Sequence, residues 1–366
     1  MQTNQVKYSN ILSRIFLASI FEEQFVIPVP PPKILENFGI WYEKNILNPD
    51  TSNIAIDKPI FLIGLHRSGT TMLQDILCCH PDIAYINNTM HIYRRSFCAC
   101  ENIRKLFNLN LKMERYLQDS VEVEADSPSE GYIVWKNWLR EDYFNYDYVE
   151  KKITDFSSKE LEDIKESIRK IIWCFGGDNK RFFSKNPALL PHILLLQDIF
   201  PDAKFVHIVR DARNSSNSMV KLFRLNQQRW KKIKHKCPEF ADKNRDISYI
   251  APRLPKLSEY IQKYGPYDIR TTANIWNDGV NFVNQNKDKI ANFYEVRYED
   301  ILANPQTEIF KIIDFCELPP VNSSHEKIFR KINQVGKVKH QQINQYGDFD
   351  IIEKICRKNL LLYRYL

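Results

Sequence analysis

The chain has 366 residues, of which 43% are hydrophobic and 27% are charged, and its formal net charge is +7. This length suits one large α/β domain with insertions, and the composition is that of a globular protein rather than a fibrous or disordered one. No run of 18 or more apolar residues occurs, so we expect no transmembrane segment. The positive charge suits an anionic nucleotide or an acidic acceptor, and we expect no nucleic-acid partner.

Residues 1–53 are predicted to form an N-terminal helical arm that precedes a main domain at residues 54–366. The apolar stretch at residues 11–21 contains Arg14 and is followed by acidic residues, which favours an amphipathic helix over a signal peptide. A proline-rich segment at residues 26–32 predicts extended backbone, and a further helix is expected after it.

Eight cysteines are scattered along the chain without the spacing of a disulfide framework or of a zinc finger. The densest group, Cys78, Cys79 and His80, falls at the end of a predicted packed helix and matches no standard metal site. We therefore expect no metal cofactor and a reducing, cytoplasmic location.

A phosphate-binding loop is predicted at residues 59–80. Pro59–Gly64 is a short apolar run, typical of a strand that is buried on both faces of a parallel sheet. Leu65–Gly69 then turns the chain, and a helix is expected from Thr70. Such a helix start directs free backbone N–H groups and the positive end of the helix dipole at one point, where a phosphate or sulfate group is the expected occupant.

The cation of this loop is placed differently from the lysine of a P-loop NTPase. That lysine follows the second glycine and reaches the β- and γ-phosphates. Here Gly69 is followed by Thr70, and Arg67 supplies the positive charge earlier in the loop. The loop is therefore predicted to hold one terminal phosphate group together with the part that is transferred.

Strands and helices alternate along the rest of the main domain. Strands are predicted at residues 83–86, 181–185, 204–209 and 292–297, and a long helix at residues 266–289. This alternation predicts an α/β fold, a P-loop-like three-layer parallel sheet with helices on both faces.

One insertion interrupts this alternation, at about residues 94–173, where charged and aromatic residues recur at helical spacing. Within it, Asp126–Glu130 is expected to begin a helix, with Pro128 near the first helical position. We expect the insertion to form a helical cap over the site.

The stretch at residues 229–255 is basic and poorly periodic. A solvated loop is the favoured interpretation. Contact with an acidic acceptor or with a membrane surface is the alternative.

A second anion site is predicted where the strand at residues 204–209 ends. Arg210 follows that strand directly, and Ser218 lies about two turns into the next helix, so a guanidinium group and a hydroxyl could hold one phosphate between them. Taken alone, an arginine followed by an aspartate is as often a structural ion pair. Two anion sites at strand ends of one sheet, however, suit a nucleotide with phosphates at both its 5′ and 3′ positions.

Both motifs resemble those of sulfotransferases that use PAPS (3′-phosphoadenosine 5′-phosphosulfate) as the sulfuryl donor. GLHRSGTT at residues 64–71 is similar to the 5′-phosphosulfate loop in its bacterial-type form with arginine, and the Arg210–Ser218 spacing is similar to the 3′-phosphate site. Further segments that resemble this family are FPDAKFV at residues 200–206, RYEDILANP at residues 297–305 and, more loosely, VGKVK at residues 335–339. The resemblance covers residues from about 54 to 339.

The resemblance implies roles for individual residues. The 5′ phosphosulfate would be bound by Arg67, Ser68, Gly69, Thr70 and Thr71. Arg210 and Ser218 would hold the 3′ phosphate, and Tyr298 would lie near the adenosine. Lys185 stands where relatives place a lysine beside the sulfuryl group.

The catalytic base is not defined by the resemblance. Cytosolic relatives have a histidine two positions after this lysine, where this chain has Pro187, and the glutamate that other relatives place after the first helix is also absent. His91 is the first candidate, because it follows the second predicted strand and histidine suits base catalysis near neutral pH. Glu130 and Asp126 are the next candidates.

The chain is therefore expected to be a PAPS-dependent sulfotransferase that acts on a hydroxyl of a carbohydrate, a lipid or another small metabolite, with 3′,5′-ADP as the second product. Two alternatives stay open. One is a P-loop-type small-molecule kinase, although the missing lysine argues against it. The other is a non-catalytic nucleotide-binding protein, because the bases that relatives use are replaced.

Overall fold

The computed structural model describes most of the chain. The described residues are 6–21, 31–114, 122–142, 145–177, 179–236, 251–322, 324–335, 344 and 349–366, without the side chains of residues 18–21 and 229–236. Most of the proline-rich segment at residues 26–32 and of the VGKVK segment at residues 335–339 lies outside the described part.

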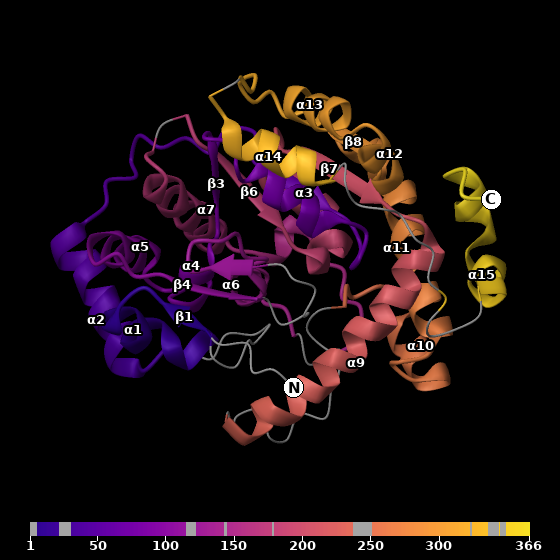
Figure 1. Cartoon of the computed structure of the whole chain (residues 1–366), viewed down its shortest axis with the longest axis horizontal. Coiled ribbons are helices and arrows are strands. Elements are labelled where there is room, and N and C mark those ends of the chain that lie inside the picture. Colours follow the sequence, from indigo (N-terminus) through magenta and orange to yellow (C-terminus); the bar gives the residue numbers. More distant parts are fainter. Residues whose placement is uncertain are drawn as a thin grey trace.

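A five-stranded parallel sheet forms the centre of the molecule (Figure 1). Its order is β3 (Ile83–Tyr85), β6 (Arg181–Lys185), β2 (Ile60–Ile63), β7 (Lys204–Val209) and β8 (Phe293–Arg297). Every neighbouring pair is parallel, and the five strands predicted from the sequence are confirmed. All residues of β2 and β7 are buried, as strands covered on both faces require.

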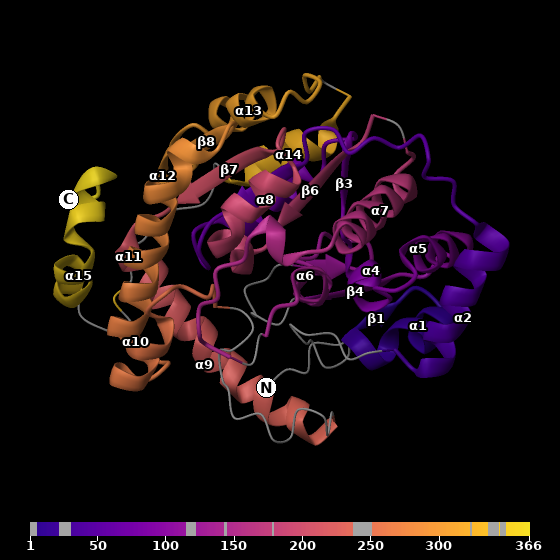
Figure 2. The same cartoon turned by 180° about the vertical axis from the view of Figure 1, so that it is seen from behind.

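Helices cover both faces of this sheet, which confirms the predicted three-layer α/β fold (Figures 1 and 2). Alternate residues of one strand join different cores: Ile60 and Leu62 pack on one face, and Phe61 and Ile63 on the other. The first face is covered by α3 (Thr70–Leu77), α12 (Tyr298–Ala303), α13 (Pro305–Phe315) and α14 (Glu326–Val335). The second is covered by α7 (Ser158–Cys174), a 3-10 helix (Pro187–His192), α8 (Ile193–Ile199), α9 (Ala212–Lys236) and α11 (Ile269–Asn286).

The insertion between β3 and β6 is partly β-structure. Its helices are α4 (Asn88–Ile92), α5 (Phe97–Leu106), α6 (Tyr132–Leu139), a 3-10 turn (Ile153–Asp155) and α7. The expectation of helix throughout residues 94–173 is wrong between α5 and α6, where β4 (Leu111–Glu114) and β5 (Glu122–Glu124) pair antiparallel. Leu111 and Met113 are buried while Lys112 is exposed, and this period of two belongs to a strand with one covered face.

The helix expected from Asp126 begins later, at Tyr132. Pro128 forms an isolated antiparallel bridge with Asn87, and the Asn88 amide donates to the carbonyl oxygen of Ser127 at 3.1 Å. These bonds hold the segment extended, so the prediction of a helix start there is wrong. The extended segment leads directly to Glu130.

The sequence predicts a solvated loop at the basic stretch, residues 229–255. The structure continues α9 to Lys236, so this prediction is wrong for residues 229–236. Lysine, arginine and glutamine are good helix formers, and a charged stretch without apolar periodicity can extend a helix into solvent. Residues 237–250 lie outside the described part, and α10 (Leu257–Tyr264) and α11 follow, the latter confirming the helix predicted at residues 266–289.

The N-terminal segment packs against the insertion. β1 (Lys7–Tyr8) pairs with β4, which gives a small sheet of order β1-β4-β5. α1 (Ile11–Phe21) confirms the helix predicted there, and α2 (Lys33–Tyr42) continues into a π-helical turn (Glu43–Leu47). Among the described helices, none is long and apolar enough to cross a bilayer. The division into an arm at residues 1–53 and a domain at residues 54–366 stays a prediction.

Glu43 ties this segment to two helices of the insertion. Its side chain is buried, and one carboxylate oxygen accepts from the amides of Cys98 and Ala99 at 2.9 and 3.0 Å. The other oxygen accepts from the Lys170 ammonium at 2.9 Å. The carboxylate therefore caps the first turn of α5 and links it to α7.

Glu43→Ala should lower the free energy of unfolding by about 3 kcal/mol, because two buried amides and one ammonium lose their shared partner. Urea unfolding followed by circular dichroism measures the change. Glu162→Ala, which removes a mostly exposed carboxylate paired with Arg169, is the matched control and should leave stability nearly unchanged. Equal losses in the two variants would contradict the capping role of Glu43.

Candidate active site

The turn between β2 and α3 forms the first part of the site. Gly69 is the N-cap residue of α3 and has φ of 98°, a conformation that glycine adopts without steric cost. A Cβ atom at Gly64 would lie 2.8 Å from Thr70 Cγ2, so strand and helix approach closely where the turn begins. Arg67 lies within the turn, next to the N–H groups that start the helix.

The Tyr298 ring lies directly on this turn. A Cβ atom added to Gly69 would fall 2.3 Å from Tyr298 Cδ2, so only glycine leaves room for the ring. The guanidinium carbon of Arg210 lies 4.4 Å from the ring centroid, in cation–π contact. The ring therefore links the turn after β2 with the residue that follows β7.

Two arginines and one serine connect the predicted anion sites. Arg210 Nη1 donates to the carbonyl oxygen of Arg67 at 3.1 Å, and Arg67 Nε donates to Ser218 Oγ at 2.7 Å. The residues predicted for the 5′ and 3′ groups are therefore neighbours. Parallel strands place their carboxyl ends at one edge of the sheet, and this brings the two motifs together.

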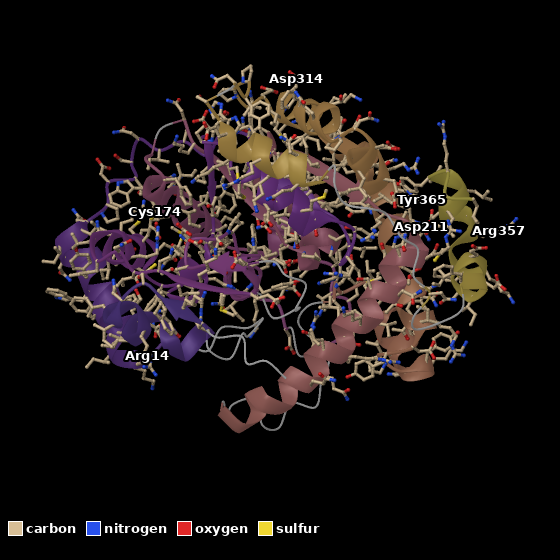
Figure 3. All side chains as sticks on the ribbon, viewed as in Figure 1. Arg14, Cys174, Asp211, Asp314, Arg357 and Tyr365 are labelled. Carbon is tan, nitrogen blue, oxygen red and sulfur yellow. The ribbon has the colours of Figure 1, made fainter. Side chains whose placement is uncertain are left out.

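The C-terminal residues brace the strand ends behind these arginines. Arg213 donates to the Asp211 carboxylate at 2.7 Å and to the Tyr365 carbonyl oxygen at 2.9 Å. The Tyr365 hydroxyl donates to Glu299 at 2.6 Å. Figure 3 shows Asp211 and Tyr365 close together, between α9 and α15 (Phe349–Leu362). This network holds the ends of β7 and β8 in place.

Lys185, at the end of β6, joins the turn to the insertion. Its side chain is buried, its ammonium donates to Thr71 Oγ1 at 3.2 Å, and it forms an ion pair with Glu130. Burial alone would raise the pKa of the Glu130 carboxyl, but the Lys185 ammonium and a hydrogen bond from Tyr132 hold that pKa below its ordinary value. Glu130 is therefore a carboxylate at neutral pH.

His66 extends this network, and nothing in its spacing predicted a role for it. Its Nε2 lies 3.1 Å from the Tyr132 hydroxyl, which also reaches Glu130. Burial lowers the pKa of His66 to about 3, so the ring is neutral. With Nε2 as the donor, the ring orients the Tyr132 hydroxyl toward the Glu130 carboxylate. The sequence signal for His66 is its position inside the loop at residues 64–71.

His91, the first sequence candidate for the base, is held at both ring nitrogens. Nε2 accepts from the Ile133 amide at 3.2 Å, so Nδ1 carries the proton and donates to Ser129 Oγ at 2.8 Å. Burial lowers the pKa of His91 to about 3. A weakly basic ring with both nitrogens occupied is suited to holding the 129–133 segment, so this geometry favours Glu130 over His91 as the base.

The two remaining site predictions, Asp126 and Ser68, have structural partners. Asp126 is half exposed and lies 3.6 Å from Arg104 on α5. Ser68 is buried, and its hydroxyl donates to the Leu65 carbonyl oxygen at 2.6 Å, which closes the turn. Their roles in binding or catalysis stay predictions.

A cavity of about 800 Å³ lies along this edge of the sheet. Arg67, Arg210 and Tyr298 line it on the side of β7 and β8. Lys185 and Glu130 line it on the side of β6 and β3. That second side continues over Ile83, Tyr85, Met113, Val123 and Phe175, which give it an apolar wall.

Comparison with known proteins places these features in one family. The model described as "Sulfotransferase family" matches residues 59–249 and 239–322, which contain the residues predicted to bind the nucleotide and the candidate bases. The chain is 22% identical over 298 residues to omega-hydroxy-beta-dihydromenaquinone-9 sulfotransferase Stf3 of Mycobacterium tuberculosis, covering 77% of this chain and 70% of the relative. It is 20% identical over 262 residues to protein-tyrosine sulfotransferase A of Caenorhabditis elegans, covering 71% of this chain and 50% of the relative.

A solved structure shares the fold. The crystal structure of sulfotransferase STF9 from Mycobacterium avium superimposes with a TM-score of 0.55 at 15% identity, covering 97% of this chain and 92% of that one. The chain therefore shares the fold of this sulfotransferase.

Gly69→Ala should weaken binding of 3′,5′-ADP by about tenfold or more, because the new methyl group displaces the Tyr298 ring from the turn. Isothermal titration calorimetry measures this affinity. Gly265→Ala is the matched control, since Gly265 also has positive φ, 82°, but nothing lies within 4 Å of an added Cβ. That variant should lose stability alone. An unchanged affinity in Gly69→Ala would show that the contact between Gly69 and Tyr298 does not contribute to nucleotide binding.

Proposed function

The chain belongs to the sulfotransferase family, and we propose that it transfers a sulfuryl group from PAPS to a hydroxyl of a carbohydrate, a lipid or another small metabolite. One observation carries this proposal. Two arginine-containing motifs, each predicted to bind an anion, meet at the ends of β2 and β7, beside a lysine–carboxylate pair at the end of β6.

The residues on the β7–β8 side fit a nucleotide that carries two phosphate-bearing ends. Arg210 has a buried Nε without a hydrogen-bond partner in the described residues, so its guanidinium group retains donor capacity for an anion. Arg67 in the first motif and Ser218 in the second lie within hydrogen-bond distance of each other, so the groups proposed for the 5′ and 3′ phosphates are adjacent. Tyr298 lines the same cavity beside Arg210, where the adenosine is proposed to lie.

Lys185 is proposed to stabilise negative charge near the donor, and Glu130 is proposed to act as the base. PAPS, when bound, supplies the activated sulfuryl group, and its transfer needs stabilisation of charge on the leaving phosphate and a base for the acceptor hydroxyl. Lys185 contacts both the donor turn, through Thr71, and Glu130. An anion bound beside Thr71 would also interact with the Lys185 ammonium. This second interaction would weaken the ion pair with Glu130 and raise the pKa of that carboxyl group. Glu130 then accepts the proton of the acceptor.

The acceptor is proposed to bind on the β3–β6 side, which Glu130 faces and which has an apolar wall. The name of the relative Stf3 gives a hydroxylated menaquinone derivative as its acceptor. An apolar wall beside a carboxylate suits an acceptor that combines a hydroxyl group with a hydrocarbon body.

Incubation with radiolabelled PAPS and a panel of hydroxyl-bearing sugars, lipids and phenols tests this function. Transfer of label to an acceptor is the expected result. Binding of 3′,5′-ADP without transfer to any acceptor would support a nucleotide-binding protein instead. Protection from thermal unfolding by ATP but not by 3′,5′-ADP would support a kinase.

Arg210→Ala should weaken 3′,5′-ADP binding by roughly 10- to 100-fold, because a charged hydrogen-bond donor to phosphate is lost. Calorimetric titration measures the affinity. Arg270→Ala, which removes an exposed guanidinium paired with Asp268, is the control and should bind the nucleotide normally. Unchanged affinity in Arg210→Ala would exclude this arginine from the site.

Glu130→Gln should lower kcat by about 100-fold or more and leave 3′,5′-ADP affinity intact, because the amide cannot accept the acceptor proton. His91→Ala should lower kcat much less, since that ring holds a neighbouring segment. The reverse ranking of the two variants would make His91 the base.

The pKa of Glu130 lies below its ordinary value, so the carboxylate stays deprotonated in the free protein as pH falls from 7 to 5. We therefore expect kcat/KM to stay level over that range in a pH–rate profile.

A further inference from the structure

Exposed apolar side chains gather near the N-terminal end of the chain. Of the fourteen large hydrophobic side chains that are exposed in the described residues, nine belong to the first two helices, the turn after them and the end of α5. These nine form what is named here the N-terminal apolar surface: Ile11, Leu12, Ile15, Ile34, Phe38, Trp41, Ile46, Leu106 and Phe107. Ordinary soluble surfaces scatter such side chains singly, so this concentration marks a contact surface.

α2 turns one side to the protein and the opposite side to solvent. Gly39 lies against Ser96, where an added Cβ would be 2.7 Å from the hydroxyl oxygen. Ile34, Phe38 and Trp41 lie away from Gly39 at spacings of four and three residues and are 77%, 47% and 52% exposed. The helix therefore presents a row of apolar side chains that no described part of the chain covers.

The end of α5 adjoins the start of α1. The Asn10 side chain donates to the carbonyl oxygen of Phe107 at 3.1 Å, which places Phe107 beside the first turn of α1. Figures 1 and 2 show α1 and α2 as neighbours at one end of the molecule, and Figure 3 shows Arg14 of α1 pointing outward there. The members of the N-terminal apolar surface thus share one end of the fold.

Basic side chains surround this surface. Lys7, Arg14, Lys33 and Lys44 are exposed. In residues 6–21 and 31–47 there are two carboxylates: Glu36 is partly buried and faces Arg95 at 3.8 Å, and Glu43 is buried and bound by Lys170. The exposed charge of these two described stretches is therefore positive, which complements an anionic partner. Glu22 and Glu23, between them in the sequence, lie outside the described part.

The surface is connected to the acceptor side of the cavity through the small sheet. β1 leads directly into α1 and pairs with β4, which pairs with β5. Met113 of β4 and Val123 of β5 line the cavity on the side where Glu130 and Lys185 lie. The three-stranded sheet would therefore lie between a partner bound to α1 and α2 and the acceptor side of the cavity.

We propose that the N-terminal apolar surface docks on a lipid bilayer that contains anionic lipids. The aliphatic side chains and Phe38 enter the interface, Trp41 lies at the level of the headgroups, and the surrounding lysines and arginine contact lipid phosphates. Docking would place the acceptor side of the cavity near the membrane, so that a hydroxylated lipid is the acceptor. This last step rests on the function proposed above, whereas docking itself does not.

Cosedimentation with phosphatidylcholine vesicles, with and without phosphatidylglycerol, tests docking in the absence of any donor or acceptor. The full chain should bind the anionic vesicles more strongly than the neutral ones, and high salt should weaken that binding. Phe38→Asp/Trp41→Asp should weaken it about tenfold or more, since charged groups replace two inserted rings. Failure of the full chain to bind anionic vesicles would overturn the proposal.

A matched control uses exposed apolar residues at the other end of the molecule. Leu361→Asp/Leu362→Asp changes two leucines of α15 that are 51% and 59% exposed, and this variant should bind vesicles like the unmodified chain. Equal loss in both double variants would also overturn the proposal. Normal 3′,5′-ADP affinity in each variant shows that it is folded, and this measurement separates a failure of docking from a failure of the proposed reaction.

The same samples test a second copy of the chain as the occupant. Sedimentation equilibrium without vesicles should show the same mass for the unmodified chain and for Phe38→Asp/Trp41→Asp. A dimer that this double variant converts to a monomer would assign the surface to self-association and overturn membrane docking.

Discussion

The ion pair between Lys185 and Glu130 joins the central sheet to the insertion between β3 and β6. Lys185 comes from the central sheet and is buried, whereas Glu130 comes from an extended segment of the insertion and is partly exposed. An ammonium group left alone in that position would cost several kcal/mol, so the insertion must return to the sheet edge to supply the carboxylate. The bridge between Asn87 and Pro128 keeps the segment extended along that return path. The ion pair and the hydrogen bond from Trp135 Nε1 to Ser184 Oγ at 2.9 Å therefore join the insertion to β6 beside the cavity.

The central sheet could be predicted from the sequence because each strand carries its own signal. β2 and β7 are uninterrupted apolar runs, and the residues that follow them have the types that bind anions. The insertion lacks such local signals. β4 and β5 are four and three residues long, too short to show a clear period of two. They pair with each other, and β4 also pairs with a two-residue strand about a hundred positions earlier in the chain, outside any local window. The sequence does not distinguish the last two turns of α9 from a loop, because a charged helix and a charged loop have the same composition.

The candidate site shows the same division between local and non-local information. The residues that contact one another around Arg67 and Arg210 belong to short motifs that, considered together, predict a nucleotide site. The choice among carboxylates and histidines for the base depends on burial and on which nitrogen atoms are already bonded. His91 has a suitable residue type and position, yet its environment removes its basicity, whereas Glu130 owes its ionisation to a lysine fifty-five positions away. Residue type alone carries no information about such surroundings.

The hydrogen bond from Arg67 to Ser218 joins the turn after β2 to α9, two elements that lie far apart in the sequence. An anion that takes up the Arg67 Nε donor would break this bond, so its binding energy would be the difference between the new contact and the one it replaces. An anion held by the backbone N–H groups at the start of α3, or by Arg210, would leave the bond in place. Occupation of the turn and the position of α9 would therefore be coupled through Arg67.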